Sequence, residues 1–286
     1  MSVLERAYAA VGTASRSFEC CDTDFEVHAE GLRAAGAVEA AVAVARDLEA
    51  QLNAFDESSA VARLAREGEV TNRHVATLVR RAREYERRTE GVFSVRHGAD
   101  ERDVKRFIDG EGGAPGAVGE AASVDVEDDT VRATRPLDLN GIAKGYIVDR
   151  AHEALDGPAR RGYVNGGGDI AGPTGGGVAV ENPWGGDSLR VLDTDWHVAT
   201  SGSYRRQRKG VDHIYRPAEG AVGARNALVT VLARRDCTEA DVLATTCAAL
   251  HPEAAIELVE GWDGAEAFLV HDGVFHRTGG FDAHVA

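Results

Sequence analysis

The chain has 286 residues, 43% of them hydrophobic, which is enough to bury one substantial core. Its formal net charge is -15, with 47 acidic against 32 basic residues. A surface of this charge repels polyanions, so the composition argues against broad binding of nucleic acid or anionic membranes. Any site for a phosphate group must therefore be local.

The N-terminal segment and the cysteines indicate the cellular compartment in which the protein is expected. Residues 1–11 alternate charged with small apolar side chains and lack the continuous apolar core of a secretory signal. No stretch approaches the ~20 apolar residues of a membrane span. Cys20, Cys21, Cys237 and Cys247 show no Cys-x-x-Cys or Cys/His spacing, so the sequence indicates neither a disulfide framework nor a zinc site. We expect a cytoplasmic protein that does not insert into membranes.

The first half of the chain is predicted to be largely helical. Apolar residues recur at helical spacing over 35–55, and a second periodic stretch covers 73–89. Residues 123–134 alternate with a period of two around Asp128 and Asp129, which indicates a hairpin.

The second half is predicted to mix short strands with helices. Helices are expected over 142–155, 238–250 and 253–260, and a hairpin around His271-Asp272-Gly273. Short strands between Gly- and Pro-rich turns are expected at 163–165, 178–181, 189–192, 197–200, 213–215 and 228–233. Because helices cluster early and strands late, without regular βαβ alternation, we expect an α+β fold in one domain, residues 1–286.

A glycine-punctuated turn opens the helix predicted at 142–155. Asp138–Tyr146 reads Asp-Leu-Asn-Gly-Ile-Ala-Lys-Gly-Tyr. Backbone N–H groups at a helix start bind anions, and Lys144 adds a point charge suited to phosphate. The alternative is a capped helix start whose lysine serves no ligand.

A second glycine-rich stretch, Asn165–Ile170, reads Asn-Gly-Gly-Gly-Asp-Ile and superficially offers the phosphate loop of a Rossmann fold. That loop must open a helix, whereas here the chain continues Ala-Gly-Pro-Thr-Gly-Gly-Gly, which cannot be helical. We therefore reject the Rossmann interpretation. What remains is a tight turn at which backbone approaches a ligand, or a plain glycine-rich β-turn.

Asp241 and Thr245 are four residues apart and share one face of the helix predicted at 238–250. A carboxylate and a hydroxyl are hard oxygen ligands suited to Mg²⁺. However, Thr238 and Asp241 also fit a capping box, and Thr245 could be ordinary helix surface. His213, on a short predicted strand, could act as a general base or bind a ligand, although a single histidine is more often structural.

Taken in order, these stretches resemble the ApbE family of FAD:protein FMN transferases. Asp138–Arg150 is similar to the family segment Asp-Leu-Gly-Gly-Ile-Ala-Lys-Gly-Tyr-Ala-Val-Asp, and Asn165–Ile170 is similar to its Gly-Gly-Asp turn. Ala199–Tyr204 is similar to Ala-Thr-Ser-Gly-Asp-Tyr, and His213–Gly220 is similar to His-Ile-Ile-Asp-Pro-x-x-Gly. Ala240–Thr245 matches Ala-Asp-Ala-Leu-x-Thr. Weaker similarity at Val11–Thr13 and Asn53–Leu64 extends the match over nearly the whole chain.

The resemblance implies an α+β, T-fold-like transferase fold with mixed or antiparallel sheets and FAD bound between lobes. It implies that Asp241, Thr245 and the backbone carbonyl of Gly141 hold Mg²⁺. By the same resemblance Asp138, Lys144 and Ile214 contact FAD, and His213 lies near the reaction.

The chain departs from the family on the flavin side. The family's Gly-x-Phe-Asp-Pro-Thr becomes Gly-Val-Phe-Ser-Val-Arg, so the expected flavin contacts there are Val92, Phe93 and Ser94. Phe55 stands where the family has a tyrosine, and residues 97–122 are short and Gly-rich. The pyrophosphate and metal motifs are thus better preserved than the isoalloxazine contacts.

The implied reaction is Mg²⁺-dependent transfer of FMN from FAD to a Thr or Ser hydroxyl of an acceptor flavoprotein, with release of AMP. In the family such acceptors include membrane-bound or cell-surface subunits. Two alternatives stay open: an Mg²⁺-dependent FAD pyrophosphatase, in which water replaces the acceptor, and a flavin-binding protein without turnover.

Overall fold

The structure is a computed structural model that describes residues 12–113, 119–155, 157, 159, 161–202, 207–208, 211–212, 214–216, 219 and 221–286. Every strand pairing in this part of the chain is antiparallel. The largest sheet has eight strands in the order β1-β2-β6-β7-β10-β15-β16-β17. Its strands are β1 (Thr13–Cys20), β2 (Thr23–Glu30), β6 (Arg161–Gly166), β7 (Asp169–Ala171), β10 (His197–Gly202), β15 (Leu228–Ala233), β16 (Ala265–His271) and β17 (Val274–Arg277).

The first two strands were not predicted. β1 and β2 form a hairpin whose two-residue turn is Cys21-Asp22, and each of these residues has a φ of 55°. Positive φ at both central positions is the mark of a type I′ turn, whose twist suits a hairpin. The expectation that helices cluster early and strands late was therefore wrong at residues 13–30, because this hairpin extends the main sheet.

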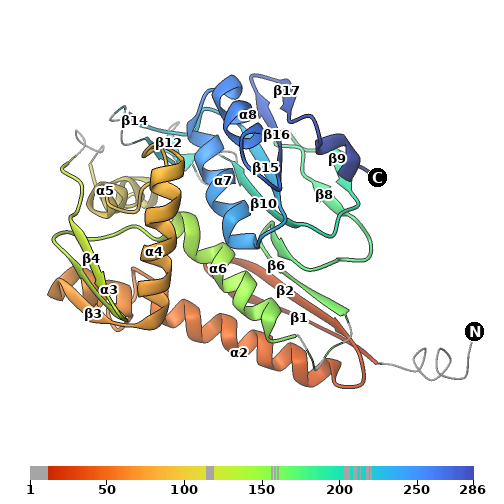
Figure 1. Ribbon diagram of the computed structural model, residues 1–286, viewed down its shortest axis with the longest axis horizontal. Coiled ribbons are helices and arrows are strands. Elements are labelled where there is room, and N and C mark those ends of the chain that lie inside the picture. Colours follow the sequence, from red (N-terminus) through yellow and green to blue (C-terminus); the bar gives the residue numbers. More distant parts are fainter. Residues whose placement is uncertain are drawn as a thin grey trace, which may run out of the picture.

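Helices cover one face of the main sheet. Figure 1 shows α2 (Ala34–Leu52), α6 (Asn140–Glu153) and α7 (Cys237–Ala249) lying across it, with α8 (Pro252–Glu260) beside α7. On the opposite face a smaller apolar cluster includes Val180, Leu192 and Phe281 from β8 (Val178–Val180), β9 (Arg190–Leu192) and the 3-10 helix η2 (Phe281–His284). All six residues of β15 are buried between these layers, which accounts for a sequence that is apolar except at Thr230.

A smaller group of elements lies at the left of Figure 1. It contains α3 (Ala60–Glu67), α4 (Arg73–Arg88), α5 (Gly98–Asp109) and a three-stranded sheet in the order β3-β5-β4. The sheet's strands are β3 (Glu69–Thr71), β4 (Val124–Glu127) and β5 (Thr130–Ala133), so the predicted hairpin at 123–134 is confirmed. α5 is a helix that the sequence does not predict, because residues 97–122 are distinguished there only as short and Gly-rich.

Short strands complete the described part: β11 (Gln207–Arg208), β12 (Val211–Asp212), β13 (Tyr215–Arg216) and β14 (Ala221–Val222). Of the strand predicted at 213–215, His213 lies outside the described residues, Ile214 is not in a strand, and Tyr215 begins β13. The other predicted helices and strands are found within a few residues of their expected bounds, and the α+β class with antiparallel sheets is confirmed.

Close packing of α6 against α7 sets the geometry around the candidate site. A Cβ built on Gly145 of α6 would lie 2.7 Å from the Cys237 carbonyl oxygen and 2.9 Å from the Thr238 Cα, so only glycine lets the two helices approach this closely. The carboxylate of Asp149, one turn further along α6, accepts hydrogen bonds from the backbone N–H groups of Cys237 (2.8 Å) and Thr238 (2.9 Å). This side chain therefore fastens α6 to the first turn of α7.

Candidate functional site

A cavity of about 840 Å³ lies where these elements meet. Its volume falls within the ~300–1,000 Å³ of typical small-molecule and cofactor sites. Ten of the residues selected from the sequence line it: Phe55, Val92, Phe93, Ser94, Asp138, Gly141, Lys144, Ile214, Asp241 and Thr245. His213 lies outside the described residues. The structure thus brings the ten together, while their individual roles stay predictions.

The three expected metal ligands converge from two helices. Gly141 lies in the first turn of α6, where a Cβ would stand 3.2 Å from Cγ2 and 3.6 Å from Oγ1 of Thr245 on α7. Asp241 lies one turn before Thr245, is only 6% exposed, and accepts a hydrogen bond from the backbone N–H of Gly145 through Oδ2 at 3.0 Å. A carboxylate, a hydroxyl and a helix-start carbonyl thus lie close together at the cavity wall.

The capping-box alternative for Asp241 is wrong. The N-cap of α7 is Asp236, whose side chain accepts from the backbone N–H of Glu239 at 2.8 Å. The Thr238 hydroxyl donates to the buried carboxylate of Asp149 instead of capping the helix. Asp241 is therefore free of any capping role and is held by α6.

Lys144 pairs with an acid to which the sequence analysis gave no role. Its ammonium forms an ion pair with Asp169, the first residue of β7, and lies 3.4 Å from the carbonyl oxygen of Gly166. The Lys144 side chain is 25% exposed and the Asp169 side chain 1%. The available signal was an acid directly after three glycines at the start of a strand, a place where a buried carboxylate needs a partner.

Charges in this cluster shift one another's protonation. Burial raises the pKa of Asp169 to about 7, an effect that the charge of Asp241 increases and that of Lys144 opposes. Burial likewise raises the pKa of Asp241. Burial acts to lower the pKa of Lys144, but the carboxylates of Asp169 and Asp241 outweigh it and the pKa is raised. With all three ionised, two carboxylates face one ammonium, so the cluster favours an additional cation.

These donors fit a magnesium ion. Mg²⁺ takes oxygen ligands, is usually held by one or two carboxylates, and completes its shell with phosphate oxygens and water. Asp241, Thr245 and the Gly141 carbonyl supply oxygen only, and the first turn of α6 offers backbone N–H groups to an anion beside them.

The glycine-rich stretch after β6 is both a turn and part of the cavity wall. Gly167 and Gly168 have φ of 66° and 105° and form the two-residue turn between β6 and β7. A Cβ on Gly167 would lie 2.3 Å from Oγ1 of Thr23. A strand follows the turn where a Rossmann loop would open a helix, which confirms the rejection of that fold.

The residues expected to contact the flavin differ in how much they already contact other parts of the protein. The Ser94 hydroxyl donates to Glu86 at 3.0 Å, and the Phe93 ring packs edge-on against Tyr85 with centroids 6.4 Å apart. Phe55 is 56% exposed, with the Lys105 ammonium 5.1 Å from its ring centroid. Of these, Phe55 has the aromatic surface most available to a ligand.

Ile214 and Asp138 complete the set of expected FAD contacts. Ile214 is buried at the cavity wall, and the Asp138 carboxylate accepts from the backbone N–H of Asn140 at 2.9 Å, directly before the first turn of α6.

Over the part of the chain that the structure describes, no helix is both long and apolar enough to cross a bilayer.

Comparisons with known proteins show which structures and which family this chain is similar to. The structure matches that of the ApbE protein from Thermotoga maritima with a TM-score of 0.84 and 21% identity, covering 96% of this chain and 100% of that one. It matches the flavin transferase ApbE from Vibrio cholerae (TM-score 0.79, 20% identity, 96% and 99% covered) and the apo flavinyl transferase ApbE from Pseudomonas stutzeri (0.76, 21%, 96% and 98%). A comparison with curated protein sequences finds no match. The sequence model of the ApbE family matches residues 21–269, most of the chain, and the chain therefore belongs to the ApbE family.

Proposed function

We propose that this protein is an FAD:protein FMN transferase that moves FMN from FAD to a Thr or Ser hydroxyl of an acceptor flavoprotein, with Mg²⁺ as cofactor and AMP as the second product. The observation that carries the proposal is the convergence of Gly141, Asp241 and Thr245 from two helices on one cavity that Lys144 also lines. Family membership supports flavin transfer as the reaction type.

The chemistry asks for positioning more than for a nucleophilic side chain. The acceptor oxygen forms a bond to the FMN phosphorus as the bond from that phosphorus to the AMP oxygen breaks, and the hydroxyl proton passes to a base. Phosphoryl-type transfer of this kind is accelerated mainly by alignment and by stabilisation of charge. When bound, Mg²⁺ would neutralise charge on the pyrophosphate oxygens.

The chain's own groups have separate roles in this proposal. Asp241, Thr245 and the Gly141 carbonyl hold the metal, and Asp169 keeps the Lys144 ammonium charged and oriented at the cavity wall. The backbone N–H groups at the start of α6 favour an anion there. His213 is the proposed base for the acceptor hydroxyl, on the sequence resemblance alone.

The test is incubation with FAD, Mg²⁺ and candidate acceptor flavoproteins, followed by mass spectrometry of the acceptor and measurement of AMP. We expect one FMN mass on a Thr or Ser and AMP release that depends on the acceptor. AMP release at the same rate without acceptor would assign the protein as a pyrophosphatase, and no turnover at all would assign it as a flavin-binding protein.

Asp241→Ala should abolish Mg²⁺-dependent turnover and leave FAD binding measurable, because the metal site loses its carboxylate. Asp263→Ala is the matched control, since Asp263 is exposed and does not line the cavity. Full Mg²⁺-dependent activity in Asp241→Ala would refute the proposed metal site.

A further inference from the structure

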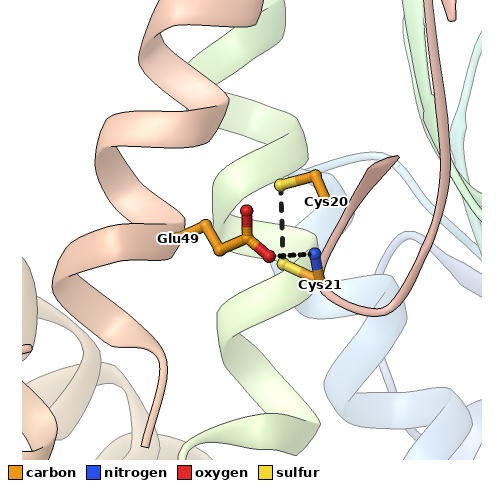
Figure 2. Close-up of side chains that lie close together, drawn as sticks. All are labelled: Cys20, Cys21 and Glu49. Atoms are coloured by element: carbon orange, nitrogen blue, oxygen red, sulfur yellow. Dashed lines mark hydrogen bonds between the residues drawn. The ribbon is translucent and has the colours of Figure 1, made fainter. Parts of the chain in front are cut away.

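Two adjacent cysteines and a glutamate form a cluster at the edge of the cavity. Cys20 ends β1, Cys21 begins the β1–β2 turn, and Glu49 lies on α2. The two sulfur atoms are 3.8 Å apart, and the backbone N–H of Cys21 donates to a Glu49 carboxylate oxygen. One ligand atom from each residue lies within 4.8 Å of the other two. Figure 2 shows the two thiols and the carboxylate facing one another between the turn and the helix.

We propose that Cys20, Cys21 and Glu49 bind a thiophilic divalent cation, with Zn²⁺ as the best match. Tetrahedral zinc has Zn–S bonds of about 2.3 Å, which places two thiolate ligands about 3.8 Å apart. The observed sulfur separation of 3.8 Å matches that edge, which is the spacing that two thiolates need to share one ion. A carboxylate oxygen of Glu49 lies within 4.8 Å of both sulfur atoms, and rotation of the glutamate side chain can bring it to bonding distance.

The backbone explains why neighbouring cysteines can share one ion. Successive side chains of a strand point to opposite faces of the sheet, so adjacent cysteines within β1 would diverge. Cys21 has left the strand and adopts the left-handed conformation of the turn, with a φ of 55°. That conformation returns its sulfur to the side of Cys20, whose thiol also points toward the Ala45 carbonyl of α2, at 3.8 Å.

Spacing rules could not have found this site, because the third ligand is 28 residues away on another element. The sequence by itself does not indicate a zinc site, because it has no Cys-x-x-Cys or Cys/His pattern. Here the hairpin turn supplies two ligands and the packing of α2 against β1 supplies the third.

Access and charge both favour a cation. Cys20 is buried, but Cys21 and Glu49 line the cavity together with Asp22, Asp24 and Glu26. An acidic wall raises the local concentration of cations. Three protein ligands would leave a fourth tetrahedral position to water or to a bound molecule.

Binding is a proton exchange without redox chemistry. Two S–H bonds break, two S–Zn bonds form, and two protons pass to solvent, while the Glu49 carboxylate binds without losing a proton. The pair therefore needs no oxidant, in contrast to a disulfide, for which the sulfur atoms would have to approach to about 2.05 Å.

The experiment is titration of reduced, metal-free, full-length protein with Co²⁺, followed by displacement with Zn²⁺. We expect one equivalent of Co²⁺ to produce the sulfur-to-metal charge-transfer band and the visible bands of tetrahedral thiolate coordination, and Zn²⁺ to abolish both. This readout does not involve flavin transfer, so its failure and the failure of the proposed function are distinguishable.

Variants assign the ligands. Cys21→Ser, at a half-buried turn position, should remove the charge-transfer band. Glu49→Gln should weaken metal affinity at least about tenfold, the lower end of what outer-shell residues alone cost. Cys247→Ala is the matched control, because Cys247 is also a free thiol but is buried on α7 with its sulfur toward the Ala255 carbonyl. Asp241→Ala should likewise retain the band.

Two results would overturn the proposal. The first is no charge-transfer band in the reduced wild type, and the second is a band that survives in Cys21→Ser. If the first result were accompanied by a metal-independent Cys20–Cys21 disulfide in protein prepared without reductant, the pair would be assigned to redox chemistry.

Discussion

Replacing Gly145 by alanine tests how the candidate site is held together. A Cβ at this position would lie 2.7 Å from the Cys237 carbonyl oxygen, 2.8 Å from the Asp241 Cβ and 2.9 Å from the Thr238 Cα. None of these atoms is the end of a flexible side chain, so they cannot move aside independently of α7. We expect Gly145→Ala to force α6 and α7 apart.

The magnitude follows from those distances. The shortest contact is about 0.7 Å below the 3.4 Å at which ordinary van der Waals contact begins, so the helices must separate by at least that much. Overpacking of this kind costs about 1–3 kcal/mol. The same shift lengthens the 3.0 Å hydrogen bond from the Gly145 N–H to the buried Asp241 carboxylate, which costs a further ~1–3 kcal/mol. Alanine's better helix propensity returns about 1 kcal/mol, which leaves a loss of about 3 kcal/mol.

The assay is urea unfolding followed by circular dichroism, with Gly36→Ala as the matched control. Gly36 also lies in a helix, α2, but is exposed, and a Cβ there would have no atom within 4 Å. Gly36→Ala should raise the free energy of unfolding by up to about 1 kcal/mol through propensity alone. The two substitutions are chemically identical, so the difference between them isolates the contact between α6 and α7.

Mg²⁺-dependent turnover should also fall in Gly145→Ala, because Asp241 moves relative to Gly141. If Gly145→Ala were as stable as Gly36→Ala, with unchanged turnover, the close approach of the two helices would not determine the site and the reasoning would be refuted.

Three further predictions concern charged and titratable groups. Lys144→Met leaves two buried carboxylates without their cation and should lower the free energy of unfolding by about 2–4 kcal/mol. Adding Asp169→Asn should restore part of that loss. No recovery in the double variant would argue against the Lys144–Asp169 pair. Burial raises the pKa of Asp149 to about 6, so the folded protein keeps this proton where the unfolded chain has lost it, and ionisation costs stability as pH rises from about 4 to 7. The stability of wild type relative to Asp149→Asn should therefore fall by about 2–3 kcal/mol over that range in denaturant titrations, and a constant difference would contradict the burial argument. If His213 is the base, single-turnover transfer at saturating FAD should slow below a pKa of about 6.5, and His213→Asn should flatten that limb while binding survives; an unchanged limb would make His213 structural.

Local patterns determined much of the fold. The helical periodicity of α2 and α4 and the alternation in β4 and β5 depend on neighbours a few residues away, so they were readable from the sequence. The hairpin of β1 and β2 was readable in principle, since Phe25, Val27 and Ala29 alternate as buried residues with less buried neighbours. Its turn residues are Cys21 and Asp22, and neither is the glycine that usually indicates a type I′ turn.

In the candidate site, too, some features could be predicted from the sequence and others could not. The spacing of Asp241 and Thr245 fixes their shared helical face, and the order of motifs was enough to suggest the family. Only the tertiary structure decided that Asp169 pairs with Lys144, that Asp149 fastens α6 to α7, and that Glu49 faces Cys20 and Cys21. Each of these contacts joins residues far apart in the chain. A sequence pattern indicates the conformation of neighbouring residues only, because it depends on local interactions. The partners of buried charges and of metal ligands are determined by how whole helices and strands pack.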